Sequence, residues 1–116
     1  MVYKVVRAAE VSAGHGPHPA GSPYDKRISD ALGLSLFEVY QVELPAGAET
    51  VQHDHLDDGN EDMYAVIRGS GWAVVDGKEV PVQPGQYVSV SVESRRFMRA
   101  GNEGMIFIAV CAGVRT

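Results

Sequence analysis

The chain lacks the features that mark secreted, membrane or nucleic-acid-binding proteins. Its 116 residues include one cysteine, Cys111, so no disulfide can form within the chain. No apolar run is long enough to span a bilayer, and no uninterrupted apolar stretch near the N-terminus forms a signal peptide. The formal net charge of -5 argues against a general nucleic-acid binder, which needs a basic surface. We therefore expect a cytoplasmic protein that binds neither membranes nor nucleic acids.

Recognisable nucleophiles and cofactor motifs are also missing. Cys111 lies in the apolar run 106–111, which predicts a small buried side chain. A reactive thiol needs exposed, electropositive surroundings, and this run does not provide them. The sequence shows no Ser-His-Asp triad, no phosphate-binding loop and no dinucleotide fingerprint. No catalytic residue is assigned from the sequence.

Short β-type segments separated by glycine and proline dominate the pattern, and the length allows one domain with one core. The predicted strands are 2–9, 36–44, 63–68, 72–75, 78–82, 86–92 and 105–114, with an extended segment at 50–55 and a helical turn at 25–32. Asp76-Gly77 is the strongest hairpin signal, because a type I′ turn requires positive φ at both central positions. Gly69-Ser70-Gly71 predicts another turn. The pattern predicts an all-β sandwich or barrel.

The N-terminal third differs from the rest, because residues 12–23 are rich in glycine and proline and predict a loop. We expect residues 1–34 to form a short strand and loop extension. This extension would pack on a β-barrel that spans residues 35–116, and the two parts would make one structural domain.

The most specific feature of the chain is His53-Asp54-His55, which is followed by Glu61-Asp62. On a strand, the i, i+2 spacing points both imidazoles to the same face of the sheet. A carboxylate from the next strand would complete a set of two histidines and one carboxylate, which suits divalent Fe, Mn, Ni or Zn. Three protein ligands would leave open positions for water or substrate. The alternative is that the histidines only line a pocket and no metal binds.

The spacing around these histidines resembles the first conserved motif of the cupin superfamily. Gly47 precedes His53 by five intervening residues, the His53/His55 pair follows, and Asp62 stands six residues before Gly69. The resemblance covers roughly residues 36–110, and over this range the chain is similar to a small single-domain cupin. It implies a jelly-roll β-barrel with a ligand site inside and with Asp62 as the third metal ligand. Because many small cupins are homodimers, we expect a homodimer.

The acidic position departs from the family pattern, which usually has glutamate where Asp62 stands. Aspartate is one methylene shorter, so the longer side chain of Glu61 is the alternative ligand. Alternation along a strand, however, points Glu61 away from a pocket that holds Asp62.

The second cupin motif departs further, because Arg96 stands where the family has its fourth ligand, a histidine. A guanidinium has only donors and stays protonated, so it cannot ligate a cation. If Arg96 points inward, it can hold the carboxylate or phosphate of a substrate. The other interpretation is an ion pair with Asp62, Glu61 or Glu38, in which Arg96 replaces the metal as the counter-charge.

Two tyrosines are further candidates for binding the substrate. Tyr64 shares the strand face of Asp62 by alternation, and Tyr40 lies in another predicted strand. A hydroxyl near a metal can orient a substrate or transfer a proton, although a core tyrosine with a satisfied hydroxyl is the alternative. His15 and His18 in the N-terminal loop are either substitutes for the missing ligand or exposed loop residues.

Three functions fit this sequence. The first is a metal-dependent cupin enzyme that acts on an anionic small molecule, with Arg96 neutralising its charge; the resemblance implies dioxygenation, decarboxylation or isomerisation. The second is a non-catalytic module for a small ligand that has lost the metal, with Arg96 in place of the fourth ligand. The third is a mainly structural dimerisation unit.

Overall fold

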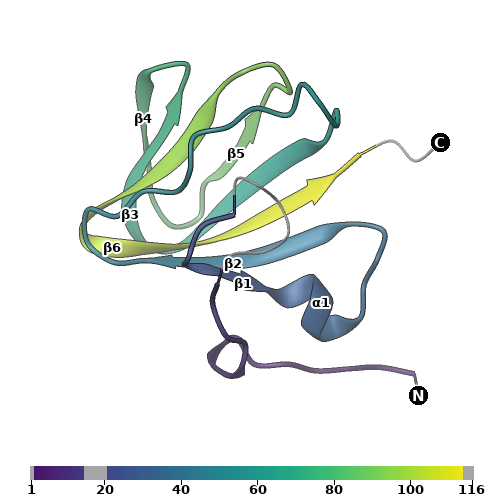
Figure 1. Cartoon of the computed structure of the whole chain (residues 1–116). Coiled ribbons are helices and arrows are strands. Elements are labelled where there is room, and N and C mark those ends of the chain that lie inside the picture. The colour runs from purple at the N-terminus through teal and green to yellow at the C-terminus, as the bar shows by residue number, and fades with distance from the viewer. Residues whose placement is uncertain (1, 15–20, 114–116) are drawn as a thin grey trace.

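The computed structural model describes residues 2–14 and 21–113, which form an antiparallel β structure (Figure 1). The elements in chain order are η1 (Ala8–Glu10), β1 (Asp25–Arg27), α1 (Ile28–Leu32), β2 (Glu38–Leu44), β3 (Glu61–Val75), β4 (Lys78–Val82), β5 (Tyr87–Val90) and β6 (Arg96–Ala112). The predicted all-β class is confirmed. Neither helix within the described ranges has the length and apolar content needed to cross a membrane.

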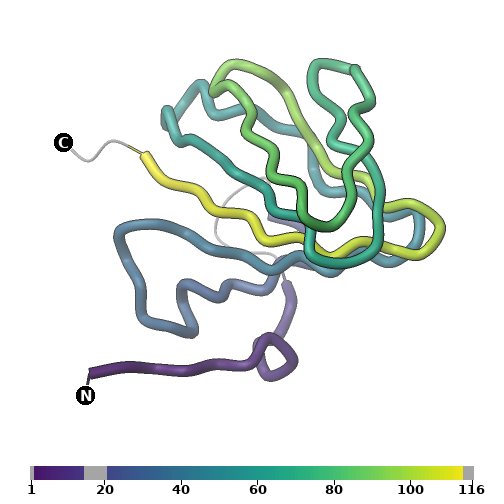
Figure 2. The backbone as a smooth tube through the Cα atoms, turned by 180° about the vertical axis from the view of Figure 1, so that it is seen from behind, coloured from purple at the N-terminus to yellow at the C-terminus, as the bar shows by residue number. Residues whose placement is uncertain are grey.

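Two long strands, β3 and β6, form the centre of the sheet. The strand order is β1-β2-β6-β3-β4, and β5 pairs with β3 as well. β3 and β6 pair from Glu61 opposite Ala112 to Val75 opposite Arg96, with two shifts in register between these ends. β4 and β5 therefore lie on one side of the molecule, and β1 and β2 lie on the other (Figures 1 and 2).

The core lies between these two halves of the sheet. It consists of buried apolar side chains from β2 to β6: Val42, Leu44, Tyr64, Val66, Ala73, Val82, Val90, Met98, Ala100, Met105 and Phe107. Because side chains alternate along a strand, the inward position of Val42 places Tyr40 and Glu38 on the same inner face of β2. The sequence pattern alone left the inner face of this strand undecided.

The predicted hairpin at Asp76-Gly77 is confirmed. Asp76 has φ 49° and Gly77 has φ 81°, as a type I′ turn requires, and Val75 pairs with Lys78 across the two-residue loop. β2, β4 and β5 also lie within their predicted ranges and begin or end up to two residues inside them.

The predicted turn at Gly69-Ser70-Gly71 is wrong, because β3 runs through these residues without a break. A Cβ at Gly71 would overlap the carbonyl oxygen of Arg99, and one at Gly69 would overlap the carbonyl oxygen of Gly104. These glycines therefore allow the backbones of β3 and β6 to approach closely at the register shifts. The same pairing makes β6 begin at Arg96, well before its predicted start at residue 105.

The predicted N-terminal strand at residues 2–9 is also wrong. Residues 2–7 pair with no strand of the described chain, and η1 follows them with no buried residue. The predicted helical turn at 25–32 divides into β1 and the short helix α1. His15 and His18 lie outside the described residues, and the domain boundary near residue 34 stays a prediction.

Candidate metal centre and ligand pocket

The segment that carries both histidines runs alongside the start of β6. The amide of His53 donates to the carbonyl of Arg96 at 3.0 Å, and the amide of Arg96 donates back to the carbonyl of His53 at 2.8 Å. Nearby, the amide of Thr50 donates to the carbonyl of Met98 at 2.9 Å. Directly paired residues in an antiparallel ladder present their side chains on the same face. His53 and Arg96 therefore face the same interior space.

Strands β2, β6 and β3 form a wall of the interior space that His53 and Arg96 face. The registers of these strands place their side chains in rows across the wall. The first row is Glu38, Cys111 and Asp62; the second is Tyr40, Ala109 and Tyr64; the third is Val42, Phe107 and Val66. Polar groups thus occupy one end of the wall, and apolar groups occupy the other.

His53, His55 and Asp62 converge as predicted, with one ligand atom from each lying within 4.8 Å of the others. Oδ2 of Asp62 is 2.9 Å from Nε2 of His55 and 3.8 Å from Nε2 of His53. Glu61, the alternative ligand, is exposed and does not belong to this group. Alternation along β3 explains the difference, because neighbouring residues face opposite sides of the sheet.

Outer contacts orient both imidazoles. Nδ1 of His53 donates to the carbonyl of Val51 at 3.0 Å, and Nδ1 of His55 donates to the carboxylate of Asp58 at 3.0 Å. Partners of this kind accompany histidines that bind metals, because they hold the proton on one nitrogen and leave the other as a ligand. Two lone pairs 2.9 Å apart repel, so a cation, either a proton or a metal ion, belongs between His55 and Asp62. The donor set therefore fits a divalent metal ion.

Arg96 is buried behind Asp62, with 1% of its surface exposed. Nη1 donates to Oδ2 of Asp62 at 2.8 Å, Nη2 donates to the carbonyl of Ser91 at 2.7 Å, and Nε donates to the carbonyl of Ser94 at 3.1 Å. All three guanidinium nitrogens are thus engaged within the protein. These contacts support the predicted ion pair with Asp62, and they weigh against a direct grip on a substrate.

Asp62 Oδ2 also accepts a hydrogen bond from the hydroxyl of Tyr64 at 2.8 Å. Burial raises the pKa of Asp62, but its contacts with His53, Cys111 and Tyr64 outweigh burial and hold the pKa well below its usual value. The pKa of Tyr64 is raised by burial and by the charge of Asp62. Burial lowers the pKa of His53, yet its contacts with Asp62 and Val51 give a net increase. Asp62 therefore stays a carboxylate, and Tyr64 stays a phenol.

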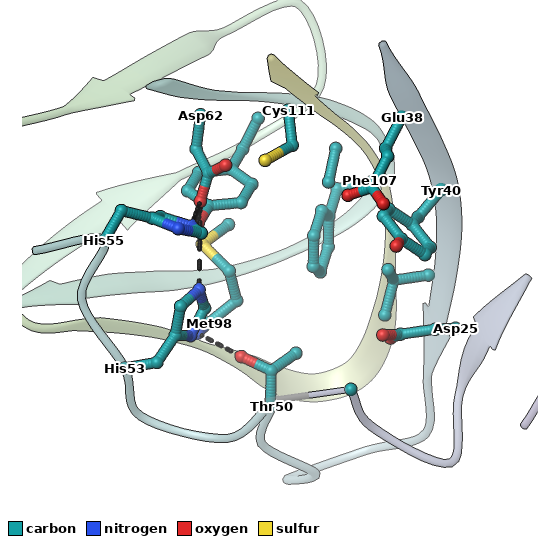
Figure 3. A pocket seen from close by; sticks show the side chains of 14 residues that line it. Asp25, Glu38, Tyr40, Thr50, His53, His55, Asp62, Met98, Phe107 and Cys111 are labelled. Atoms are coloured by element: carbon teal, nitrogen blue, oxygen red, sulfur yellow. Dashed lines mark hydrogen bonds and ion pairs between the residues drawn. The ribbon is translucent and has the colours of Figure 1, made fainter. Parts of the chain in front are cut away.

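A pocket of about 80 Å³ opens beside this cluster. Figure 3 shows His53, His55 and Asp62 on one side, with Glu38 and Tyr40 across the pocket from them. Burial and the charge of Glu38 raise the pKa of Tyr40 to about 12, so it too is a phenol.

Cys111 also lines the pocket and is only half-buried, which corrects the prediction of a buried core thiol. Burial and the neighbouring charge of Asp62 raise its pKa, so the thiol stays protonated. The apolar run around it concealed this position, because β6 turns one face toward the pocket and the other away from it. Asp58 carried no sequence signal beyond its place in a polar loop three residues after His55.

Comparisons with known proteins agree with this architecture. No protein-family model and no curated protein sequence matches the chain. A cupin protein from Bacteroides fragilis superposes with a TM-score of 0.78 and 22% identity, covering 100% of this chain and 88% of that protein. A sugar phosphate isomerase of the cupin superfamily from Silicibacter pomeroyi gives 0.76 and 22%, covering 97% and 76%. An RmlC-like cupin from Desulfovibrio desulfuricans gives 0.59 and 25%, covering 66% and 71%.

These likenesses concern the fold. The chain has the cupin jelly-roll fold, which confirms at this level its resemblance to the cupin superfamily. Within this fold, it carries a His53/His55/Asp62 group that can hold a metal ion.

Proposed function

We propose that this cupin binds one divalent metal ion through His53, His55 and Asp62 and acts on a small molecule in the adjoining pocket. The observation that carries the proposal is the orientation of the two imidazoles, whose Nδ1 atoms are held by Val51 and Asp58. Both Nε2 atoms are thereby left to face Asp62. Fe, Mn, Ni and Zn all suit such a donor set, and three ligands leave room for a substrate oxygen.

The chain's own residues have distinct parts in this proposal. Arg96 holds the carboxylate of Asp62 in place and keeps it charged, so it acts through Asp62 and not on the substrate. Tyr64 donates to the same carboxylate oxygen. When bound, the metal ion would polarise an oxygen of the substrate as a Lewis acid.

Across the pocket, Glu38 and Tyr40 supply a carboxylate and a phenol for proton transfer. This pair favours isomerisation over dioxygenation and decarboxylation, because isomerisation requires only that a proton move between atoms of the substrate. The sugar phosphate isomerase that shares the fold agrees with this choice, although fold alone does not assign a reaction.

The test is metal titration by calorimetry on untagged protein, with Zn²⁺, Mn²⁺, Ni²⁺ and anaerobic Fe²⁺. Wild type should bind about one ion, as the one three-ligand group among the described residues implies. His53→Ala should abolish binding, and Asp58→Asn should weaken it by about 10- to 100-fold because an outer partner is lost. Asp57→Asn, a change to an exposed carboxylate of the same loop, is the matched control. A His53→Ala variant that binds metal as tightly as wild type would disprove the site.

A metal-free, non-catalytic cupin is the second candidate, and one observation favours it. Oδ2 of Asp62 already receives donors from Arg96 and Tyr64, so Arg96 can serve as a permanent counter-charge. The same titration separates the two candidates. Metal binding by wild type supports the first, whereas binding that appears only in Arg96→His supports the second.

A further inference from the structure

A second and more polar pocket adjoins the first. It measures about 530 Å³ and is lined by residues of β1, α1, β2 and β6 together with the loops beside them, among them Arg27, Ser29, Asp30 and Asn60. Glu38 and Cys111 line both pockets, and they lie directly opposite each other in the β2–β6 register. The two pockets therefore meet at this pair of residues.

Arg27 is the basic side chain that lines this polar pocket among the described residues. Nη1 forms an ion pair with Asp30 at 2.6 Å, and the guanidinium lies close enough to hydrogen-bond the hydroxyl of Tyr40. Arg27 sits opposite Tyr40 in the β1–β2 register, so it reaches from the polar pocket toward the metal-side pocket. Its place between the two pockets suits the recognition of one end of a ligand.

Nε of Arg27 is buried without a hydrogen-bond partner, and it is the one side-chain polar atom in that state among the described residues. A buried charged donor without an acceptor is unfavourable, and such an atom calls for an explanation. The side chain as a whole is 30% exposed, so rotation of the guanidinium can present Nε to the pocket. An acceptor oxygen of a ligand would then satisfy it.

The charged side chains that line the polar pocket limit which group of a ligand can supply the acceptor oxygen for Arg27. Asp30 and Glu38 line the same space as Arg27, so the lining carries two carboxylates and one guanidinium. A ligand group with a single negative charge can pair with Arg27 through a planar, two-oxygen face. A phosphate dianion would meet stronger repulsion from the two carboxylates.

We propose that the two pockets together bind a short-chain hydroxy acid. Its hydroxyl or carbonyl oxygens lie at the His53/His55/Asp62 end, and its carboxylate lies in the polar pocket against Arg27. The metal end of this arrangement rests on the proposed function, whereas the carboxylate end rests on Arg27 alone.

The test compares three four-carbon compounds that differ at one end: threonate, threitol and threitol phosphate. Their affinities are measured by calorimetry on the full chain, with and without Zn²⁺. Threonate should bind at least about tenfold tighter than threitol, because it adds charge-assisted hydrogen bonds to Arg27. Threitol phosphate should bind more weakly than threonate. Arg27→Met should bind threonate no better than threitol, whereas the exposed Arg68→Met control should keep the preference.

Arg27→Lys keeps the charge and the pairing with Asp30 but lacks the planar fork, and it should retain only part of the preference. Equal binding of threonate and threitol, tighter binding of threitol phosphate, no binding by any compound, or a preference that survives in Arg27→Met would each overturn the proposal. Metal affinity is measured separately and should be the same in Arg27→Met as in wild type. A wild type that binds no metal yet prefers threonate through Arg27 would refute the metal site and leave the carboxylate pocket standing.

Discussion

Asp62 is the residue on which the site depends, because Arg96 and Tyr64 both donate to one of its oxygens and Nε2 of His55 lies 2.9 Å from the same oxygen. The pairing with Arg96 is largely buried, because 1% of Arg96 and 8% of Asp62 are exposed. Removing one member of a buried ion pair leaves the other desolvated and uncompensated. The two residues therefore act as one unit in the stability of the fold.

We predict that Arg96→Met lowers the free energy of unfolding by about 3–5 kcal/mol, because it leaves the carboxylate of Asp62 buried without its cation. The double variant Asp62→Asn/Arg96→Met should recover most of that loss. Urea unfolding followed by circular dichroism measures both values. A double variant as unstable as the sum of the two single variants would show that the residues do not interact.

At the scale of single residues, the sequence predicted that the side chains of His53, His55 and Asp62 converge. The i, i+2 spacing of His53 and His55 reflects an extended backbone, which pairs with the start of β6 at His53, and Asp62 lies near the start of β3. The sequence could not reveal Asp58 or the inner position of Glu38. A loop conformation and the choice between two strand faces both depend on tertiary packing, which no local pattern encodes.

The two long strands organise the site at the scale of elements. β3 contributes Asp62 near its start, while β6 contributes Arg96 at one end and Cys111 near the other. The strands can stay paired along this length only because glycines let their backbones approach where the register shifts. The positions of Asp62, Arg96 and Cys111 therefore depend on a close approach of β3 and β6 at which none of these three residues lies.

We predict that Gly71→Ala destabilises the protein by about 1–3 kcal/mol or more, because its Cβ would overlap the backbone carbonyl of Arg99 and no rotamer can relieve this. Gly14→Ala is the matched control, since a Cβ there meets nothing within 4 Å, and it should change stability by less than about 0.5 kcal/mol. Chemical denaturation of both variants measures the difference. Equal stability of the two variants would contradict the close approach.

Glycine also explains which elements the sequence pattern misassigned. Gly69 and Gly71 predicted a turn because glycine usually ends a strand, but here it permits two strands to touch. Gly101 and Gly104 similarly concealed the first half of β6, which continues through them. The Asp76-Gly77 hairpin was predictable because its signal is local, whereas a close approach depends on the partner strand.

At the scale of the whole molecule, the N-terminal arm, residues 2–7, carries exposed apolar side chains that nothing in the described chain covers. Val2, Tyr3 and Val5 are exposed by 95%, 74% and 80%. The arm leads away from the sheet toward the N-terminus (Figure 1), and Lys26 fixes its base by donating to the carbonyl of Ala8 at 2.9 Å. Several exposed apolar side chains on one short segment are typical of a protein–protein contact.

We predict that the protein is a homodimer in which the arm of one copy packs on the other copy. Deleting residues 2–7 should convert the dimer to a monomer, because it removes the exposed apolar side chains. Sedimentation equilibrium measures the mass of both forms. Ile67→Lys, a change to an exposed apolar residue on β3, should leave the dimer intact. A monomeric full-length chain, or a dimer that survives the deletion, would contradict the prediction.

The buried pairing of Asp62 with Arg96 also constrains how this lineage can diverge. A protein in which only one of the two residues is substituted has an unpaired charge in its interior. Because this is destabilising, selection removes most such variants. Positions 62 and 96 should therefore change together or not at all. A change to histidine at position 96 would have to occur where a metal ion is already available to take over the charge of the arginine.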